Sequence, residues 1–305
     1  MTGVRGRRYP AIDLSGAVVV ITGGGRGIGK ATGAAFAARG ATVSLGDIDE
    51  QAARGAAREV GRGARAYRVD VTSRGSFSAF IDAVLAELGG VDVLVNNAGV
   101  MPLGGFVDEA DEISRAALDV NVWGPMHGMR ITLPHMTVRG RGHVVTVASM
   151  AGKIPIPGMA SYNASKYAAV GLTAALRREY AGSGVSISAV LPSAVRTELA
   201  SGVPLGKGLP TVDPEAVAEA VVRSCRTRKA EIPVPRYLGG WDLLAALTPE
   251  PVMRVLRGLI GDDRALTSVD PAGRAAYERR VARQAATSGE EPPPGRSRAR
   301  HPTSN

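Results

Sequence analysis

The chain has 305 residues, 45% of them hydrophobic, which is enough to bury the core of one large domain. Most of its net charge of +9 lies at the ends: residues 1–12 carry three arginines and no acid, and residues 264–305 carry eight arginines against four acids. Charged ends are usually solvated, so this distribution argues against a nucleic-acid partner. The single cysteine, Cys225, excludes an intrachain disulfide.

The N-terminal arginines are followed by the apolar run Ala17–Ile21, which is too short for a secretion signal. No later stretch is long and apolar enough to cross a bilayer. We therefore expect a cytoplasmic protein.

Short runs rich in β-branched residues alternate with longer helical patterns along most of the chain. Such alternation predicts a doubly wound α/β fold, in which parallel strands are joined by right-handed helical crossovers. The predicted strands are Val18–Thr22, Thr42–Leu45, Ala66–Val69, Val91–Val95, His143–Val147 and Val185–Leu191. Ligands bind such a sheet at the carboxyl ends of its strands, so motifs there are the ones to examine.

Beyond the sixth predicted strand the alternation becomes less regular. Pro214–Arg226 has the pattern of a helix, and Ala230–Val234 that of a last edge strand. Residues 238–260 have apolar groups at helical spacing, interrupted by two prolines, which predicts a helical C-terminal extension. From Thr287 onward Pro, Gly, Ser and Arg dominate without an apolar pattern, so we expect a disordered tail.

A glycine-rich turn follows the first predicted strand and opens a helix. Its sequence is Thr22-Gly23-Gly24-Gly25-Arg26-Gly27-Ile28-Gly29. Glycines allow a tight turn, and a helix N-terminus offers N–H groups and a positive dipole end to a pyrophosphate. A glycine-rich run alone is a weak signal. Its place between strand and helix predicts that a dinucleotide contacts Gly23, Arg26, Gly27, Ile28 and Gly29.

The second predicted strand is followed by Asp47, about twenty residues beyond the glycines, where a carboxylate can accept hydrogen bonds from the adenosine ribose. This carboxylate would repel the 2′-phosphate of NADP, whereas Arg26 could attract it. Because a carboxylate is costly to desolvate against a phosphate, we predict NAD as the cofactor, with NADP as the less favoured alternative. A solvated turn residue is the other interpretation of Asp47.

Two further segments follow predicted strands. Asp70 and Val71 are placed to border the adenine, although Asp70 could instead cap the next helix. Asn96-Asn97-Ala98-Gly99 closes the fourth strand, where small residues let the backbone pass close to a nucleotide and amides can join neighbouring strands. A plain turn is the alternative for this second segment.

Tyr162 and Lys166 are four residues apart at the start of a predicted helix that runs to Tyr180, so their side chains share a face. An ammonium beside the phenol is expected to lower the phenol's pKa from about 10, so that it can exchange a proton with an alcohol or carbonyl oxygen. Ser149 lies thirteen residues earlier, at the end of a strand, and can hydrogen-bond the same oxygen. A surface Tyr–Lys pair is the alternative.

The sequence lacks the residue patterns of serine hydrolases and of metal sites. Ser149 is not in a Gly-x-Ser-x-Gly turn, and the four histidines show neither a triad pattern nor metal-ligand spacing, so we predict no serine hydrolase and no metal site. Asn121 lies inside a predicted helix, which is unfavourable unless its side chain has a local role such as bending the backbone around a water.

Together these residues resemble the short-chain dehydrogenase/reductase family, of the single-domain type, over about Leu14–Ile232. The turn matches its glycine motif at Thr22, Gly23, Gly27, Ile28 and Gly29. Asn96 to Gly99 match its Asn-Asn-Ala-Gly motif, and its catalytic set matches Asn121, Ser149, Tyr162 and Lys166. The resemblance implies a Rossmann-type three-layer α/β/α fold. It also implies that Lys166 holds the nicotinamide ribose, that Asn121 fixes a water in a proton relay, and that a homodimer or homotetramer forms through the helices after Tyr162 and Pro214.

The chain departs from the family in two places. Pro192-Ser193 stands where the family usually has Pro-Gly, while Val195 and Thr197 still match positions used at the nicotinamide carboxamide, so Pro192, Val195 and Thr197 join the expected cofactor contacts. The extension beyond residue 235 is similar to members that handle retinoids, steroids and other lipophilic alcohols. We accordingly divide the chain into a basic arm (1–12), a dinucleotide-binding and catalytic domain (13–236), a helical extension (237–286) and a disordered tail (287–305).

The predicted function is reversible hydride transfer between NAD and a secondary alcohol or ketone. The substrate is expected to be apolar, because the candidate pocket walls are Met101, Leu103, Ile154, Pro157, Met159, Val203 and Leu205. Two alternatives stay open: an NAD-binding regulator that does not turn over substrate, and a protein whose basic tails or C-terminal segment contact anionic membranes.

Overall fold

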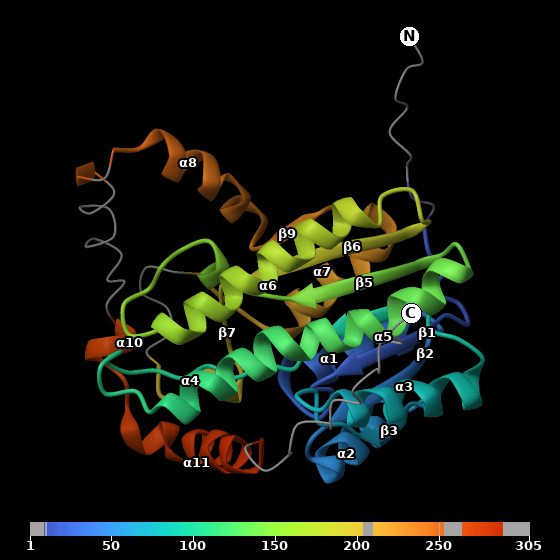
Figure 1. Cartoon of the computed structure of the whole chain (residues 1–305), viewed down its shortest axis with the longest axis horizontal. Coiled ribbons are helices and arrows are strands. Elements are labelled where there is room, and N and C mark those ends of the chain that lie inside the picture. Colours follow the sequence, from blue (N-terminus) through green and yellow to red (C-terminus); the bar gives the residue numbers. More distant parts are fainter. Residues whose placement is uncertain (1–8, 10, 204–209, 250, 253–263, 289–305) are drawn as a thin grey trace, which may run out of the picture.

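The computed structural model describes residues 9, 11–203, 210–249, 251–252 and 264–288. Seven parallel strands form one sheet in the order β3-β2-β1-β4-β5-β6-β9 (Figure 1). The strands are β1 Val18–Thr22, β2 Thr42–Asp47, β3 Arg65–Arg68, β4 Val93–Asn96, β5 Gly142–Val147, β6 Val185–Pro192 and β9 Glu231–Val234. The predicted doubly wound sheet is confirmed. Its strand order reverses between β1 and β4, where such folds form a crevice for ligands.

Helices cover both faces of the sheet. One face carries α1 Gly27–Ala37, α2 Glu50–Val60 and α7 Pro214–Thr227. The other carries α3 Arg74–Leu88, α4 Asp111–Leu118, α5 Gly124–Val138 and α6 Ala160–Glu179. The three predicted layers are therefore present.

Strand β1 shows why the sheet is covered on both sides. Val19 and Ile21 pack with Phe36 of α1, whereas Val18 and Val20 pack with Phe80 of α3. Side chains alternate between the faces of a strand, so a run of apolar residues such as this one needs a core on each face.

The described parts of the C-terminal extension are largely helical, as the sequence predicts, while residues 253–260 of the predicted helical run lie outside the described residues. It contains α8 Trp241–Leu247, α10 Arg264–Thr267 and α11 Pro271–Ser288. Figure 1 shows α8 standing away from the sheet, while α11 lies alongside α4, which it contacts. Helix α11 continues two residues into the tail expected to be disordered, and residues 289–305 lie outside the described residues, as does most of the basic arm. Within the part of the chain that the structure describes, no helix is long and apolar enough to span a membrane.

Candidate active site

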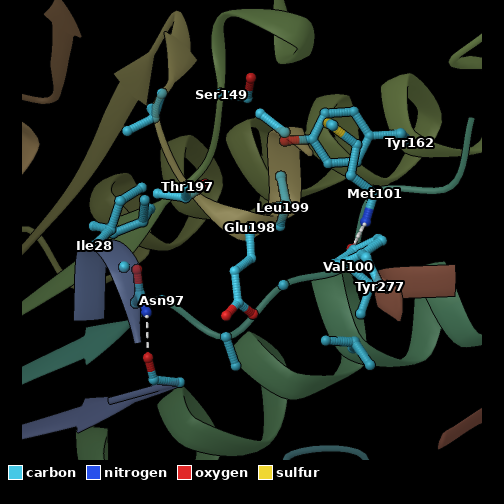
Figure 2. A pocket seen from close by; sticks show the side chains of 18 of the residues that line it. Ile28, Asn97, Val100, Met101, Ser149, Tyr162, Thr197, Glu198, Leu199 and Tyr277 are labelled. Carbon is cyan, nitrogen blue, oxygen red and sulfur yellow. Dashed lines mark hydrogen bonds between the residues drawn. The ribbon is translucent and has the colours of Figure 1, made fainter. Parts of the chain in front are cut away.

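A cavity of about 340 Å³ lies at the carboxyl ends of the central strands. Its lining includes residues that directly follow β1, β4, β5 and β6. Figure 2 shows Ile28 and Asn97 on one side of this cavity, and Met101, Tyr162 and Tyr277 on the other. The site therefore forms at the edge of the sheet that the fold class predicts.

The glycine turn is fastened to the end of β4. Asn97 donates from Nδ2 to the carbonyl oxygens of Thr22 at 2.9 Å and Gly23 at 3.0 Å, and its backbone N–H donates to the Thr22 hydroxyl at 3.1 Å. Gly29 packs under this turn so closely that a Cβ there would lie 2.0 Å from the Gly23 carbonyl oxygen. The turn consequently needs glycine at this position, and its backbone faces the cavity at Gly23 and Gly27.

Acidic side chains surround the outer end of the turn. Asp47 accepts from the backbone N–H of Gly25 at 2.9 Å and of Asp49 at 3.0 Å. Arg26 donates to Asp49 at 2.5 Å and lies 4.0 Å from Glu198, and the bond from Arg26 lowers the pKa of the Asp49 carboxyl. The charge of Arg26 is thus matched by two acids, while Asp47 stays on the cavity wall.

Asp70 and Val71 lie between β3 and α3. Val71 lines the cavity, but Asp70 does not. The Asp70 carboxylate accepts from the backbone N–H and the hydroxyl of Thr72, at 2.9 and 2.7 Å. The alternative that Asp70 caps the next helix is wrong, because Ser73 is the N-cap of α3. That Asp70 contacts the adenine stays a prediction. Asp70 lies three positions before Ser73, and the sequence gives no signal that tells which of the two caps the helix.

Tyr162 and Lys166 lie on one face of the first turns of α6, and both line the cavity with Ser149. Tyr162 is 6% exposed and Lys166 5% exposed. The Lys166 ammonium lies 5.5 Å from the centre of the Tyr162 ring and donates to the Val147 carbonyl oxygen at 3.3 Å. The predicted convergence of a strand end and a helix start over one pocket is present.

Burial dominates the protonation of this pair. It raises the pKa of the Tyr162 phenol above its ordinary value, an effect that the hydrogen bond with Ser149 opposes. It lowers the pKa of Lys166 to about 8. The expectation that the ammonium brings the phenol's pKa down is therefore wrong for the protein alone, since removing both groups from water outweighs their proximity.

Asn121 lies in a single π-helical turn, Asp119–Trp123, that joins α4 to α5. Its side chain accepts from the Val100 backbone N–H at 2.9 Å and donates to the Val100 carbonyl at 2.8 Å and the Ser165 hydroxyl at 2.9 Å. The side chain thus joins the loop after β4 to the helix that carries Tyr162. It does not line the cavity itself.

The segment after β6 covers the cavity. Pro192, Val195 and Thr197 line it, and short strands β7 Ala194–Val195 and β8 Thr211–Val212 pair beside it. Ser193, which stands where the family usually has glycine, donates from its hydroxyl to the Pro210 carbonyl at 2.5 Å. The hydroxyl therefore holds the two ends of this segment together.

Most of the predicted site residues reach the same cavity. Its lining includes Gly23, Arg26, Gly27, Ile28, Asp47, Val71, Asn97, Ala98, Gly99, Ser149, Tyr162, Lys166, Pro192, Val195 and Thr197, but not Gly29, Asp70 or Asn121. Of the predicted apolar walls, Met101, Leu103, Met159 and Val203 line it, whereas Ile154 and Pro157 do not. Leu205 lies outside the described residues. Ile154 packs instead with Val170 and Leu191 beneath the site.

The cavity also contains residues that the sequence did not indicate. Ala265 of α10 and Tyr277, Arg280, Val281 and Gln284 of α11 line it. Figure 2 shows Tyr277 among them. They come from the extension that the sequence separates from the catalytic domain. No local motif marks them, because their position depends on contacts with segments far away along the chain.

Among the described residues, no group of three or more His, Cys, Asp or Glu side chains is suited to a metal. The buried histidine His143 lies between Ser186 and Ser224, where it has a structural role.

The short chain dehydrogenase family matches residues 17–207, which include the glycine turn and the Tyr162–Lys166 pair. The chain belongs to this family. This short-chain dehydrogenase is therefore an NAD(P)-dependent oxidoreductase, as its fold and glycine turn indicate.

The chain is similar to several proteins of known name or structure. It is 35% identical over 224 residues to oxidoreductase UcpA of Escherichia coli, covering 72% of this chain and 84% of that protein. It is 33% identical over 251 residues to mouse estradiol 17-beta-dehydrogenase 11, covering 80% and 84%. A Burkholderia phymatum short chain dehydrogenase/reductase solved in complex with NAD has 28% identity and a TM-score of 0.69, covering 78% of this chain and 98% of that one.

Proposed function

We propose that this short-chain dehydrogenase transfers hydride reversibly between NAD and an apolar secondary alcohol or its ketone. One observation carries the proposal: Tyr162, Ser149 and Lys166 line the same cavity as the glycine turn and Asp47. A proton-transfer group and a nucleotide cradle are both needed for oxidation of an alcohol, and here they share one space.

The residues present fit a nicotinamide dinucleotide. The close packing of Gly29 under Gly23 brings the turn's backbone and the start of α1 to the cavity wall, which suits a pyrophosphate. Asp47 at the end of β2 suits the adenosine ribose hydroxyls. Because Arg26 is engaged by Asp49, it is less available to a 2′-phosphate, which supports NAD over NADP. The bound nicotinamide would supply or accept the hydride.

Each polar side chain has a role that follows from its place. We assign to Tyr162 the transfer of the proton to or from the substrate oxygen, and to Ser149 a hydrogen bond that orients that oxygen. Lys166 is placed to hold the nicotinamide ribose and to supply positive charge beside the phenol. Asn121 holds the loop at Val100 against α6, which fixes the distance between the two sides of the site.

An apolar substrate is supported by the remaining wall. Met101 and Met159 are buried against Tyr162, with Leu103 and Val203 packed beside them. Apolar side chains around a few convergent polar groups are typical of pockets for lipophilic ligands. The likeness to a relative named as an estradiol dehydrogenase agrees with this class of substrate.

The direct experiment compares the parent with Tyr162→Phe, using a panel of secondary alcohols with NAD and NADP in parallel. We expect the variant to lose about 10²-fold or more in turnover while it still binds NAD, because the phenyl ring keeps the shape but cannot move the proton. Tyr167→Phe, at the exposed neighbour on α6, is the matched control and should stay fully active.

Equal turnover by Tyr162→Phe and the parent would contradict the proposed chemistry, and a strong NADP preference would contradict the role given to Asp47. Tight NAD binding by a parent that oxidises none of the panel would favour the regulator alternative.

On the family likeness we propose a homodimer or homotetramer through α6 and α7. On the sequence we propose a cytoplasmic location and no nucleic-acid partner, because the excess positive charge lies at the ends of the chain. The alternative of membrane contact is supported by α8, where Leu243 and Leu247 are 66% and 74% exposed.

A further inference from the structure

We infer that α11 is a wall of the substrate pocket, in which Arg274 positions the segment 197–203 and Tyr277 limits the size of the alcohol that fits. The inference rests on the proposed function, because it concerns the substrate of that site. It involves residues beyond the part of the chain that the family match covers.

Arg274 joins two loops that start at different strands. It is fully buried, and its guanidinium donates to the carbonyl oxygens of Leu199 at 3.3 Å and Ser201 at 3.0 Å and to that of Met101. Its Nε lies 3.3 Å from Glu278. A buried guanidinium is stable only where such partners replace water, so these carbonyls and Arg274 hold one another in place.

Tyr277 forms the pocket wall one turn further along α11. Its hydroxyl accepts a hydrogen bond from the Met101 backbone N–H at 2.7 Å, and the residue is 6% exposed. The guanidinium carbons of Arg274 and Arg280 lie 4.8 and 5.3 Å from its ring centre, an arrangement that favours a fixed ring. Figure 2 shows this ring next to Met101 and Val100, on the side of the cavity where Tyr162 lies.

The start of α11 fits closely against the segment 197–203. The Asp270 N–H donates to the Gly202 carbonyl at 2.8 Å, and a Cβ on Gly202 would lie 2.6 Å from the Asp270 carbonyl oxygen and 3.0 Å from Arg274 Cβ. Gly202 also has a φ of +72°, which favours glycine. Both features show that this contact requires glycine at position 202.

The other end of the segment is held by charge. Arg280 pairs with Glu198 at 2.8 Å, and Glu198 lies 4.0 Å from Arg26 of the glycine turn. Helix α11 thus contacts the segment at Glu198, Leu199 and Ser201 while Tyr277 and Val281 face the cavity. A substrate lying beside Tyr162 meets the Tyr277 ring, so this ring limits how large an alcohol fits there.

The specificity test compares the parent with Tyr277→Ala, using cyclohexanol as a compact alcohol and a steroid alcohol as a bulky one. We expect the kcat/KM ratio of steroid to cyclohexanol to rise about tenfold or more in Tyr277→Ala, because removing the ring opens the wall. Dissociation constants for NAD should not change.

For Arg274→Ala we expect a higher KM for cyclohexanol with kcat within about threefold of the parent. Arg279→Ala, an exposed arginine on the same helix, is the control.

A second measurement does not depend on turnover. Amide hydrogen exchange should accelerate at least tenfold at Met101 in Tyr277→Phe, and over residues 197–203 in Arg274→Ala, but not in Arg279→Ala. Unchanged exchange at both places would overturn the inference, and so would an unchanged substrate ratio in an active Tyr277→Ala. A parent without activity would contradict the proposed function, while accelerated exchange would still support the wall.

Discussion

Lys166 carries its charge in a place where water has little access. It is 5% exposed, and its ammonium donates to the Val147 carbonyl at 3.3 Å. Burial lowers its pKa to about 8, so keeping the side chain protonated at neutral pH costs folding free energy. The residue is thus retained at a cost to stability, as is common for groups that serve a reaction.

Replacing Lys166 with methionine should therefore make the protein more stable while abolishing turnover. Lys166 has a pKa near 10.4 in the unfolded chain and about 8 in the folded chain. Below pH 8 the buried charge of Lys166 therefore lowers the free energy of unfolding by roughly 3 kcal/mol. The gain of Lys166→Met should appear at pH 7 and disappear above about pH 10, where the lysine is neutral in both states. Urea unfolding of parent and variant at both pH values measures it. A variant less stable than the parent at pH 7 would contradict this argument.

One property of the Tyr162–Lys166 pair could be predicted from the sequence, and another could not. A spacing of four on a helix is a local property, so the shared face of Tyr162 and Lys166 could be predicted. The protonation of the pair could not, because the burial of Tyr162 depends on Met101 and Ala265, which reach the site from other segments. The sequence also did not indicate that the Asp70 carboxylate accepts from Thr72.

The π-helical turn between α4 and α5 carries one side chain that joins it to two other segments. Asn121 uses its amide oxygen and nitrogen on both backbone groups of Val100 and on Ser165, all of them buried. A π-turn adds a residue to a helical turn and often occurs at functional sites. It here rotates Asn121 toward the loop after β4.

We expect Asn121→Ala to lower the free energy of unfolding by roughly 2–4 kcal/mol, because the Val100 N–H and carbonyl would lose their partner without gaining water. Turnover should fall as well, since α6 would no longer be fixed against the loop. Thermal and urea unfolding give the first quantity and steady-state kinetics the second. Glu112→Ala, at an exposed position on α4, should change neither. A stability loss below about 0.5 kcal/mol would show that the turn does not depend on this amide.

Strands and helices differ in how well the sequence indicated them. Runs such as Val18–Thr22 are buried on both faces, so their β-branched composition alone predicts a strand. The π-turn had only an ill-placed asparagine as its signal. The Asn121 side chain bonds with Val100, which lies 21 residues earlier in the chain. Local helix propensity cannot indicate such a contact.

Over the whole molecule, the doubly wound sheet and the position of the cavity could be predicted, because alternating strands and helices leave few arrangements. The place of α11 could not. Its contacts with Met101 and Leu199 join parts of the chain more than seventy residues apart, and a buried arginine looks the same in sequence as an exposed one. The catalytic domain and the extension consequently form one site, although composition separates them.

A buried histidine connects β5 with β6 and α7. His143 of β5 is fully buried, with Nδ1 2.8 Å from the Ser186 hydroxyl of β6 and Nε2 2.8 Å from the Ser224 hydroxyl of α7. Arg228 donates to the same Ser186 hydroxyl at 2.5 Å. Burial, together with the charge of Arg228, lowers the pKa of His143 to about 3. The ring is therefore neutral in the folded protein.

This histidine should make the whole fold sensitive to acid. Below pH 6.5 the unfolded chain binds a proton at residue 143 and the folded chain does not, so stability falls as pH decreases from 6.5 toward 3. The contribution is about 1.4 kcal/mol per pH unit. In His143→Gln this part of the slope should vanish, although the variant is less stable at pH 8 because Ser186 and Ser224 lose their partner. His135→Gln, at an exposed ring on α5, should keep the parent's slope. Urea unfolding between pH 4.5 and 8 distinguishes these outcomes, and parallel slopes for the parent and His143→Gln would exclude His143 as the origin of acid sensitivity.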